Sequence, residues 1–401
     1  MGGILGSALA LHYRQRLEPD GRGPLLGQRH PRPDHPDRLA DRGPEGALQT
    51  AGRSGGGKDR SGGILSGSAE IGTLLPGRFV KKKIICVSPN TNIERTWVVP
   101  GLHLGGVFHV QQEVLLASGK GINVARGVHL LGQTAMCMGF IAGHIGRLID
   151  DLAQREGLEC DWTWVQGESR EAFALVDPQA GGGDATLISG QGPQITAADW
   201  QRLASTVLEQ SRWADLVCFS GSFPPGSPLE AFTQLILRLR DTGKTVWIDC
   251  SRDVLQAALE GRPNGIKINS HEAGDLVGFT VSNLETAVRV ATRLREQGIE
   301  QVVLTMGVQG AIMVDGASAW RVSAAELPGV LSTVGSGDAF LAGLLVGLSK
   351  GEDLPAALRS AAAAGGANVL TLGGGNFTPQ DFEQAYRSVH LRRIDGSPAY
   401  E

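Results

Sequence analysis

Residues 332–340 read Ser-Thr-Val-Gly-Ser-Gly-Asp-Ala-Phe, and residues 341–348 continue as Leu-Ala-Gly-Leu-Leu-Val-Gly-Leu. The glycines favour a tight turn, and the apolar run after them predicts a buried helix. The first backbone N–H groups of a helix have no partners within it, and they lie at the positive end of its dipole. The sequence therefore predicts an anion site made by the amides of Gly335, Ser336 and Gly337, with Asp338 at the start of the helix.

Two roles are open for Asp338 on this pattern. If the anion is a transferring phosphoryl group, the amides stabilise its developing charge and the carboxylate accepts the proton of the attacking hydroxyl. The other role is an ordinary helix cap after a glycine turn, which is the commoner one for an aspartate in such a place. The stretch alone does not decide between a catalytic base and a cap.

The composition indicates a globular protein. The chain has 401 residues, 41% hydrophobic and 19% charged. No apolar run reaches the ~18 to 20 residues of a membrane span, so we expect no membrane partner. The cysteines are scattered without CxxC spacing, which favours free thiols in a reducing compartment and predicts a cytoplasmic protein.

The first 80 residues differ from the rest. They are dense in Gly, Pro, Arg and His and show no sustained period of 2 or 3.6 residues, so residues 1–80 are predicted to be a disordered or non-native extension. Through Lys83 there are 14 Lys and Arg against 8 Asp and Glu, a net charge of +6, which leaves −10 for the remainder. The acidic remainder argues against a nucleic-acid partner.

From Lys81, β-rich runs alternate with segments of helical period. The predicted strands are Lys83–Val87, Leu216–Ser220, Thr245–Ile248, Gly265–Ile268 and Gln301–Thr305. Two helices are predicted to start at the capping residues Ser227 and Ser282, and Gly298 is predicted to end the second. The alternation predicts an α/β domain over residues 81–395, with a doubly wound, mostly parallel sheet and helices on both faces. Ligands of such folds bind at the carboxyl ends of the strands.

Two segments do not follow this alternation. Trp97–Leu116 and Glu171–Ser189 are rich in Val, Leu, Phe and Thr, are broken by glycines, and carry no helix signature. We interpret them as a small β-structured lid that excludes water from a site. The alternative is that they are ordinary edge strands and surface hairpins.

Two motifs resemble the signatures of one protein family. Residues 333–340 resemble the C-terminal signature of the PfkB/ribokinase family of carbohydrate kinases, and residues 119–126, Gly-Lys-Gly-Ile-Asn-Val-Ala-Arg, are similar to its N-terminal signature. The resemblance runs from about Ile84 to about Val389. It implies a ribokinase-like fold, ATP and Mg²⁺ as cofactors, Asp338 as the catalytic base and the amides of residues 335–337 as its anion hole.

The same resemblance implies a nucleotide and metal site. Residues 267–272 resemble the K-P-N-x-x-E segment of the family, in which Asn269 and Glu272 would help to hold magnesium through water, next to the nucleotide phosphates. The other residues it implies for ATP are Lys267, Thr305, Gly307, Gly310 and Asn368, together with Gly335 and Gly337. Without the resemblance, Glu272 is interpreted as a first-turn glutamate that stabilises the helix dipole.

Residues 88–90 and 220–226 look most like the phosphofructokinase and tagatose-6-phosphate kinase branch of the family. In that branch a lysine and an arginine contact the phosphate already on the sugar, and Lys120 and Arg170 stand at the matching positions. The remaining substrate residues implied are Asn90, Glu94, Gly119, Asn123 and Ser222. Glu94 replaces the usual aspartate, and the longer side chain is expected to alter selectivity by roughly 1 to 3 kcal/mol.

The function expected from the sequence is an ATP- and magnesium-dependent kinase acting on a hydroxyl of a hexose phosphate. Fructose 1-phosphate is the first choice of substrate, and fructose 6-phosphate or tagatose 6-phosphate come next. Two alternatives stay open, a kinase of an unphosphorylated sugar or nucleoside and a non-catalytic sugar-phosphate sensor. A homodimer through the lid is the expected assembly.

Overall fold

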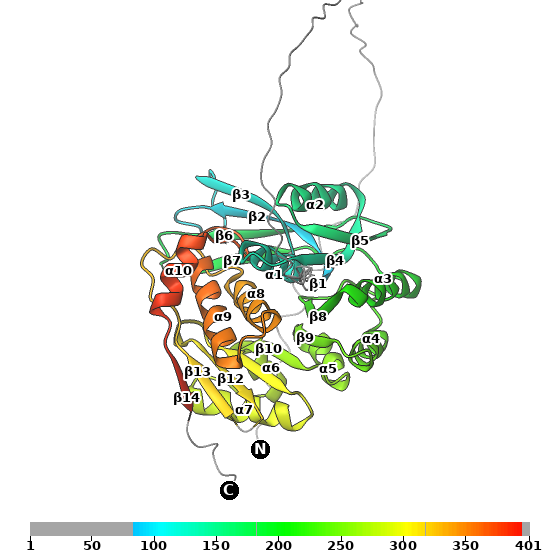
Figure 1. The fold of residues 1–401 in the computed structure, drawn as a ribbon. Helices are drawn as coiled ribbons and strands as arrows, with labels where there is room; N and C mark the ends of the chain where they lie inside the picture. Colours follow the sequence, from blue (N-terminus) through cyan, green and yellow to red (C-terminus); the bar gives the residue numbers. More distant parts are fainter. Residues whose placement is uncertain (1–82, 182, 317, 395–401) are drawn as a thin grey trace, which may run out of the picture. The chain divides into compact units, whose positions relative to one another are not determined.

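The computed structural model describes residues 83–394 except for residues 182 and 317. All described residues belong to one compact unit, which contains a large sheet between two layers of helices and a separate small sheet (Figure 1). The extension predicted over residues 1–80 lies outside the described residues. No helix among the described residues is long and apolar enough to cross a membrane.

The large sheet has ten strands in the order β14-β13-β12-β11-β10-β9-β8-β1-β4-β5. The seven strands from β11 to β5 pair in parallel, and the three beyond β11 pair antiparallel. The bounds are β1 (Lys83–Asn90), β4 (Ala135–Ala142), β5 (Glu159–Val165), β8 (Ala214–Ser220), β9 (Thr245–Asp249), β10 (Gly265–Asn269), β11 (Gln301–Thr305), β12 (Ala311–Asp315), β13 (Ser318–Val322) and β14 (Leu391–Ile394). The five predicted strands and the α/β class are confirmed.

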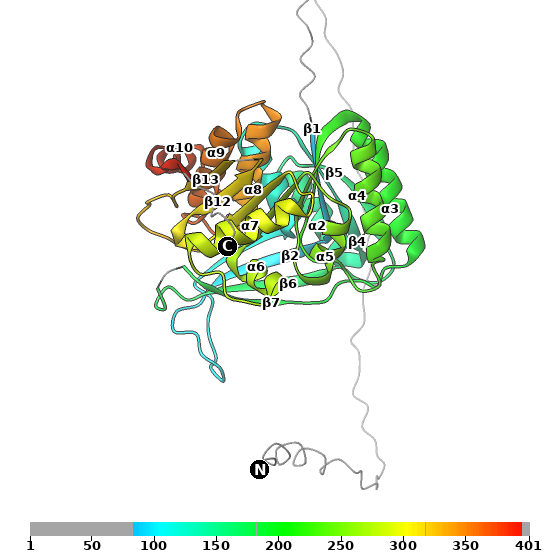
Figure 2. The same cartoon turned by 90° about the horizontal axis from the view of Figure 1, so that it is seen from below.

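Side-chain alternation along the strands divides the interior into two cores. Ile84 and Cys86 of β1 belong to one core, whereas Ile85 and Val87 belong to the other, because successive side chains of a strand point to opposite faces. One face is covered by α1 (Lys120–Leu130), α2 (Gly143–Arg155), α8 (Ser336–Ser349), α9 (Leu354–Asn368) and α10 (Pro379–Ser388). The other is covered by α3 (Ala197–Gln210), α4 (Leu229–Asp241), α5 (Arg252–Glu260), α6 (Ser270–Val277) and α7 (Leu284–Glu296). In Figure 2, α8, α9 and α10 of the first group and α3 and α4 of the second lie on opposite sides of the view.

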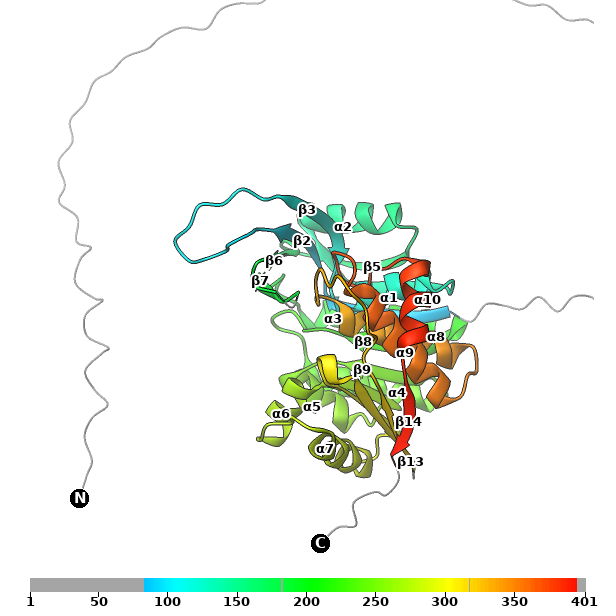
Figure 3. The same cartoon turned by 90° about the vertical axis from the view of Figure 1, so that its left-hand side faces the viewer.

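The small sheet has four strands in the order β3-β2-β6-β7. They are β2 (Asn92–Val98), β3 (Gln112–Ser118), β6 (Arg170–Val176) and β7 (Ala185–Ser189). The sheet contains much of the two segments interpreted as a lid, but it begins at Asn92, five residues before Trp97. The loop between β2 and β3 extends away from both sheets (Figure 3).

The two predicted capping residues were each wrong by one position. Helix α4 has Pro228 as its N-cap, and the Ser227 hydroxyl instead donates to a backbone carbonyl. Helix α7 is capped by Asn283, whose side chain accepts from the amide of Thr286, so the capping box does not begin at Ser282. Asparagine is as good a cap as serine, and two adjacent candidates leave the choice to the packing of the helix. The predicted end of α7 at Gly298 is confirmed by its positive φ and its bond to the last turn.

Candidate active site

The turn before α8 requires glycine at position 335. Gly335 has a φ of 79°, and a Cβ there would lie 2.1 Å from the Cα of Gly374. The amide of Ser336 donates to the carbonyl of Thr333 at 3.2 Å. Within the described part of the chain, the amides of Gly335 and Gly337 have no acceptor. The predicted hole of three amides therefore has two free donors, because that of Ser336 is already in use.

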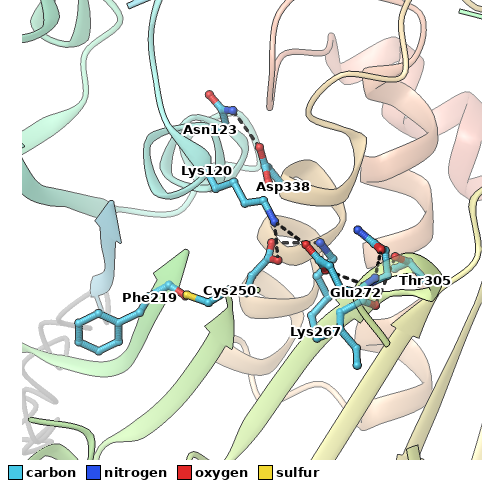
Figure 4. A network of polar contacts seen from close by, with 11 residues as sticks. Lys120, Asn123, Phe219, Cys250, Lys267, Glu272, Thr305 and Asp338 are labelled. Carbon is cyan, nitrogen blue, oxygen red and sulfur yellow. Dashed lines mark hydrogen bonds and ion pairs between the residues drawn. The ribbon is translucent and has the colours of Figure 1, made fainter. Parts of the chain in front are cut away.

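Asp338 is buried in the first turn of α8. It is 6% exposed, and its Oδ2 accepts a hydrogen bond of 2.8 Å from the side-chain amide of Asn123 on α1 (Figure 4). Burial and the charge of Asp249 raise the pKa of Asp338 to about 6, although two lysines and the Asn123 hydrogen bond oppose the rise. The N-cap of α8 is Gly335, so the structure does not support the role of a cap. A carboxylate with this pKa can accept a proton at pH 7.

A cluster of lysines and carboxylates lies between the ends of β9 and β10 and the starts of α1 and α6 (Figure 4). The Nζ of Lys120 donates to Asp249 at 3.1 Å and to Glu272 at 3.3 Å. The Nζ of Lys267 donates to the other oxygen of Asp249 at 3.0 Å. A Cβ on Gly337 would lie 2.9 Å from this Nζ, so the Lys267 ammonium lies beside the free amides of the turn.

The cluster is held together by charge despite its burial. Burial opposes the ionised form of Asp249, but Lys120 and Lys267 outweigh it and lower the pKa of this carboxyl. Burial likewise opposes the Lys120 ammonium, and the carboxylates around it outweigh burial and raise its pKa. Lys120 therefore stays charged at neutral pH, next to the place where an anion would bind.

Asn269 and Glu272, the predicted metal residues, form the capping box of α6. The Asn269 side chain accepts from the Glu272 amide at 2.8 Å, and the Glu272 carboxylate accepts from the Asn269 amide at 3.0 Å. Residues 83–394, without 182 and 317, contain no group of three His, Cys, Asp or Glu side chains that could hold a metal ion. Magnesium is commonly bound through one or two carboxylates together with substrate phosphates and water. The Glu272 carboxylate and the Asn269 side-chain oxygen are donors of the kind that such an ion uses.

A second polar group surrounds the end of β1. The side-chain amide of Asn90 donates to the hydroxyl of Ser222 at 3.3 Å, and Arg170 donates to the Asn90 carbonyl at 3.0 Å and to Asn92 Oδ1 at 3.4 Å. The buried Oδ1 of Asn90 and Nδ2 of Asn92 have no partner among the described residues. Because an unpaired buried polar atom is costly, these two atoms are suited to a ligand that carries hydroxyl groups.

Arg170 differs from the lysines in its lack of a counter-charge. It is partly buried at the start of β6, and burial lowers its pKa. Its guanidinium contacts carbonyl and amide oxygens, and no carboxylate among the described residues pairs with it. Lys120, which the sequence grouped with Arg170 as a phosphate ligand, instead pairs with Asp249 and Glu272.

Glu94 lies on the buried face of β2. Burial raises its pKa, although the charge of Arg126 and hydrogen bonds from Ser118 at 3.3 Å and Thr96 at 3.4 Å oppose the rise. The Ser118 hydroxyl also lies 3.2 Å from the side-chain oxygen of Asn123. The carboxylate expected to bind a sugar hydroxyl is thus connected through Ser118 and Asn123 to Asp338. Next to these side chains, Gly119 is the N-cap of α1. Its φ is 118°, and a Cβ there would lie 2.5 Å from a serine hydroxyl oxygen.

The residues predicted for the nucleotide divide into two groups. Thr305 ends β11 directly beside Asn269 of β10, and Gly307 and Gly310 form the turn that follows, with φ values of 55° and 87°. These residues lie at the carboxyl edge of the sheet, as expected. Asn368 does not: it is fully buried, and its side chain bonds the backbone of residues 334, 373 and 375. These bonds hold the loop of residues 373–375, which packs against Gly335.

Three residues of the site were not identified from the sequence. Asp249 follows a predicted strand, where a carboxylate at the carboxyl end of a parallel sheet indicates a ligand site. Arg126 lies in the motif at residues 119–126, but its partners Glu156 and Gly374, like the partner of Asn92, are far away in the chain. The hollows of about 760 Å³ and about 530 Å³ beside α10 contain none of the predicted site residues, so the polar chemistry locates the site better than the size of a cavity.

Residues 82–381 match the pfkB family of carbohydrate kinases, and the chain belongs to this family. It is therefore a phosphotransferase with an alcohol group as acceptor, and a sugar-phosphate kinase within the family. The similarity to proteins named 1-phosphofructokinase favours the sugar-phosphate kinase over the two alternatives that the sequence left open.

Relatives of the chain support this class. A 1-phosphofructokinase of Escherichia coli strain K12 is 32% identical over 284 residues, which cover 71% of this chain and 90% of that protein. A 1-phosphofructokinase of Bacillus subtilis is 28% identical over 288 residues, covering 72% and 93%. The solved structure of Escherichia coli phosphofructokinase-2 in complex with substrates and products has a TM-score of 0.70 and 25% identity, covering 76% of this chain and 98% of that one.

Proposed function

We propose that this protein transfers the γ-phosphoryl group of ATP to a hydroxyl of fructose 1-phosphate, with fructose 6-phosphate and tagatose 6-phosphate as the next candidates. The observation that carries the proposal is Arg170, a partly buried cation without a carboxylate partner, beside the unpaired side-chain atoms of Asn90 and Asn92. An arginine suits phosphate because its planar fork donates two parallel hydrogen bonds. The names of the relatives make fructose 1-phosphate the first choice.

In this proposal the acceptor hydroxyl lies at Asp338. The hydroxyl oxygen forms the new bond to the γ-phosphorus, the bond to the β–γ bridging oxygen breaks, and Asp338 takes the proton. The free amides of Gly335 and Gly337 and the Lys267 ammonium stabilise the charge on the phosphoryl oxygens. Lys120 is the second cation that faces this position.

Magnesium, when bound, would neutralise the nucleotide phosphates, and Asn269 and Glu272 would hold it through water. The turn at Thr305, Gly307 and Gly310 would support the nucleotide. The resemblance to the family implies these assignments, and the position of the residues at one edge of the sheet supports them.

The small sheet acts in this proposal as a lid that excludes water from the transfer. Glu94 on its buried face binds a sugar hydroxyl, and Arg170 at its edge binds the sugar phosphate. Its other face carries Trp97, Phe173 and the exposed Ile188, which would form the interface of a homodimer.

The test is the kinetics of Arg170→Ala with ATP and a panel of the three sugar phosphates. Loss of a charge-assisted contact should raise the KM for the preferred sugar phosphate about 10- to 150-fold, and the KM for ATP should barely change. Arg95→Ala is the matched control, because Arg95 lies on the same sheet but pairs with Glu113 and Glu171. It should change neither KM.

The wild-type enzyme should show its highest kcat/KM with fructose 1-phosphate. A higher value with fructose 6-phosphate or tagatose 6-phosphate would make that sugar phosphate the proposed substrate. The proposed type of reaction would be unchanged. An unchanged sugar KM in Arg170→Ala would exclude Arg170 as the phosphate ligand. A parallel rise in both KM values would point to a lid that no longer closes.

A further inference from the structure

Arg126 of α1 is a buried arginine whose five N–H groups are all in use. It is 4% exposed. Its Nε and Nη2 bind the carboxylate of Glu156 at the end of α2, and Nη2 also donates to the Ala117 carbonyl. Its Nη1 donates to Asn123 Oδ1 at 3.0 Å and to the Gly374 carbonyl at 2.6 Å. A guanidinium has five donors, so nothing is left over for a ligand.

The contact with Asn123 decides which way that amide points. Arg126 can only donate, so the group facing it must be the oxygen of Asn123, and the NH₂ group must then face Asp338. In the flipped amide, two donors would face each other at Arg126 and two acceptors at Asp338. Without Arg126, the hydroxyl of Ser118 is the remaining group at Asn123 Oδ1, and a hydroxyl can donate or accept. Arg126 is therefore the residue that fixes the hydrogen bond to Asp338.

The contact with Gly374 reaches the anion hole. The backbone of residues 373–375 packs so closely on the turn before α8 that a Cβ on Gly335 would lie 2.1 Å from Gly374 Cα. The same loop lies against Asn123, because a Cβ on Gly374 would come within 2.4 Å of its side-chain nitrogen. The third contact, with Ala117, is made to the end of lid strand β3, one residue before Ser118.

We propose that Arg126 is a positioning residue for phosphoryl transfer, which fixes Asn123 and residues 373–375 and thereby places the Asp338 carboxylate and the Gly335 amide. The inference rests on the proposed function, because it takes Asp338 as the base. Glu156 supplies the counter-charge that allows the guanidinium to be buried.

The first experiment compares wild type with Arg126→Met/Glu156→Gln, which removes the cation and its counter-charge together. Misplacement of the base should lower kcat about 10- to 100-fold, while the KM for ATP stays within about threefold. The acid limb of the pH–kcat profile should move up, because Asp338 loses the donor that favours its ionised form. Lys120 of α1, Lys267 of β10 and Asp249 of β9 act on Asp338 in both proteins.

The control is Arg240→Met/Glu300→Gln. This pair joins the end of α4 to residues before β11 and includes a donation from Arg240 to a backbone carbonyl, so the chemistry removed is similar. It should leave kcat and the pH profile as in wild type. A loss of stability alone would lower the melting temperature of the Arg126 variant without moving its acid limb, and that outcome would overturn the proposal.

A double-mutant cycle tests the route through Asn123. In an Asn123→Ala background, the Arg126→Met/Glu156→Gln change should lose most of its effect on kcat, since the amide to be oriented is absent. Fully additive effects would show that Arg126 does not act on Asp338 through Asn123 and would overturn this part of the proposal.

Arg126→Lys keeps the charge for Glu156 but offers three donors on a single atom, and it provides a folded variant if the double change does not fold. Wild-type kcat and pH profile in Arg126→Lys would contradict the inference. The proposed function is tested separately. Full activity in Asp338→Asn would show that Asp338 is not the base, whereas a negative result at Arg126 leaves the Asp338 result unaffected.

Discussion

Around Asp338, opposing effects set the pKa of one carboxyl. Burial and Asp249 disfavour its ionised form, and Lys120, Lys267 and the Asn123 amide favour it. The result is a carboxylate whose pKa of about 6 lies above that of an exposed aspartate but below neutral pH. Such a group is ionised in a neutral cell and still basic enough to accept a proton from a hydroxyl.

At this scale the prediction is that Asp338→Asn lowers kcat at least ~10²-fold while ATP binding is retained, because the amide keeps the size of the side chain but accepts no proton. In wild type, kcat/KM should fall as the pH drops through about 6, where Asp338 becomes protonated. Steady-state kinetics from pH 5 to 8 and a nucleotide titration are the measurements.

Asp353→Asn is the matched control. Asp353 caps α9 with a bond of 2.8 Å to the Ala356 amide, and asparagine caps a helix as well as aspartate does. It should keep full activity. If Asp338→Asn also kept most of the wild-type rate, Asp338 would not be the base.

The folded pKa of Asp338 also predicts the direction of a stability effect. Because it is raised above the unfolded value, the native state binds the proton more tightly, and this group's contribution to stability is present at low pH and lost as the pH rises through about 6. The difference in melting temperature, Asp338→Asn minus wild type, should therefore be more positive at pH 8 than at pH 4.

On the scale of a single element, the small sheet uses its two faces differently. Glu94 and Thr96 of β2 pair with Ala172 and Ala174 of β6 on the buried face. The opposite face has Trp97 and Phe173 in contact, with ring centroids 5.2 Å apart, and Ile188 of β7 beside Phe173 is 56% exposed. An exposed apolar face on a lid is suited to pairing with a second copy of the chain.

We therefore predict that Ile188→Asp shifts the protein toward the monomer at micromolar concentration, measured by sedimentation velocity. A charge in an apolar interface is costly to bury, so the dimer should weaken at least tenfold. Trp213→Asp is the control, because Trp213 is 70% exposed in the short helix after α3 and lies outside the lid. A wild-type protein that is monomeric at every concentration would contradict the proposed dimer.

For the whole molecule, the site is assembled within the residues that match the family. The proposed substrate, nucleotide and catalytic residues extend from Asn90 to Asp338, and the match covers residues 82–381. The first strand of the sheet begins at Lys83. Nothing that the proposed reaction uses lies before this strand.

A chain that begins at residue 81 should accordingly keep its melting temperature within a few degrees and its kcat and KM within about twofold. Thermal unfolding and steady-state kinetics of the truncated and full chains are the measurements. An insoluble or inactive truncated protein would mean that residues 1–80 contribute to the fold or to the site, contrary to the disordered extension predicted there.

What the sequence by itself determined is local. The alternation of apolar residues predicted the sheet and its two covered faces, because side-chain period follows directly from backbone geometry. The glycine turn before the apolar run of residues 341–348 predicted the start of α8 and the anion site, because free amides at a helix start need no distant partner.

The tertiary structure alone decided how distant side chains pair. Lys120 was grouped with Arg170 from the motif, yet it pairs with Asp249, 129 residues away, and Asn123 meets Asp338 across 215 residues. Arg126 lies in the motif at residues 119–126, yet its partners Glu156 and Gly374 are 30 and 248 residues away. Such contacts depend on how the strands are ordered in the sheet, and strand order is set by the packing of the whole core, which no short stretch of sequence specifies.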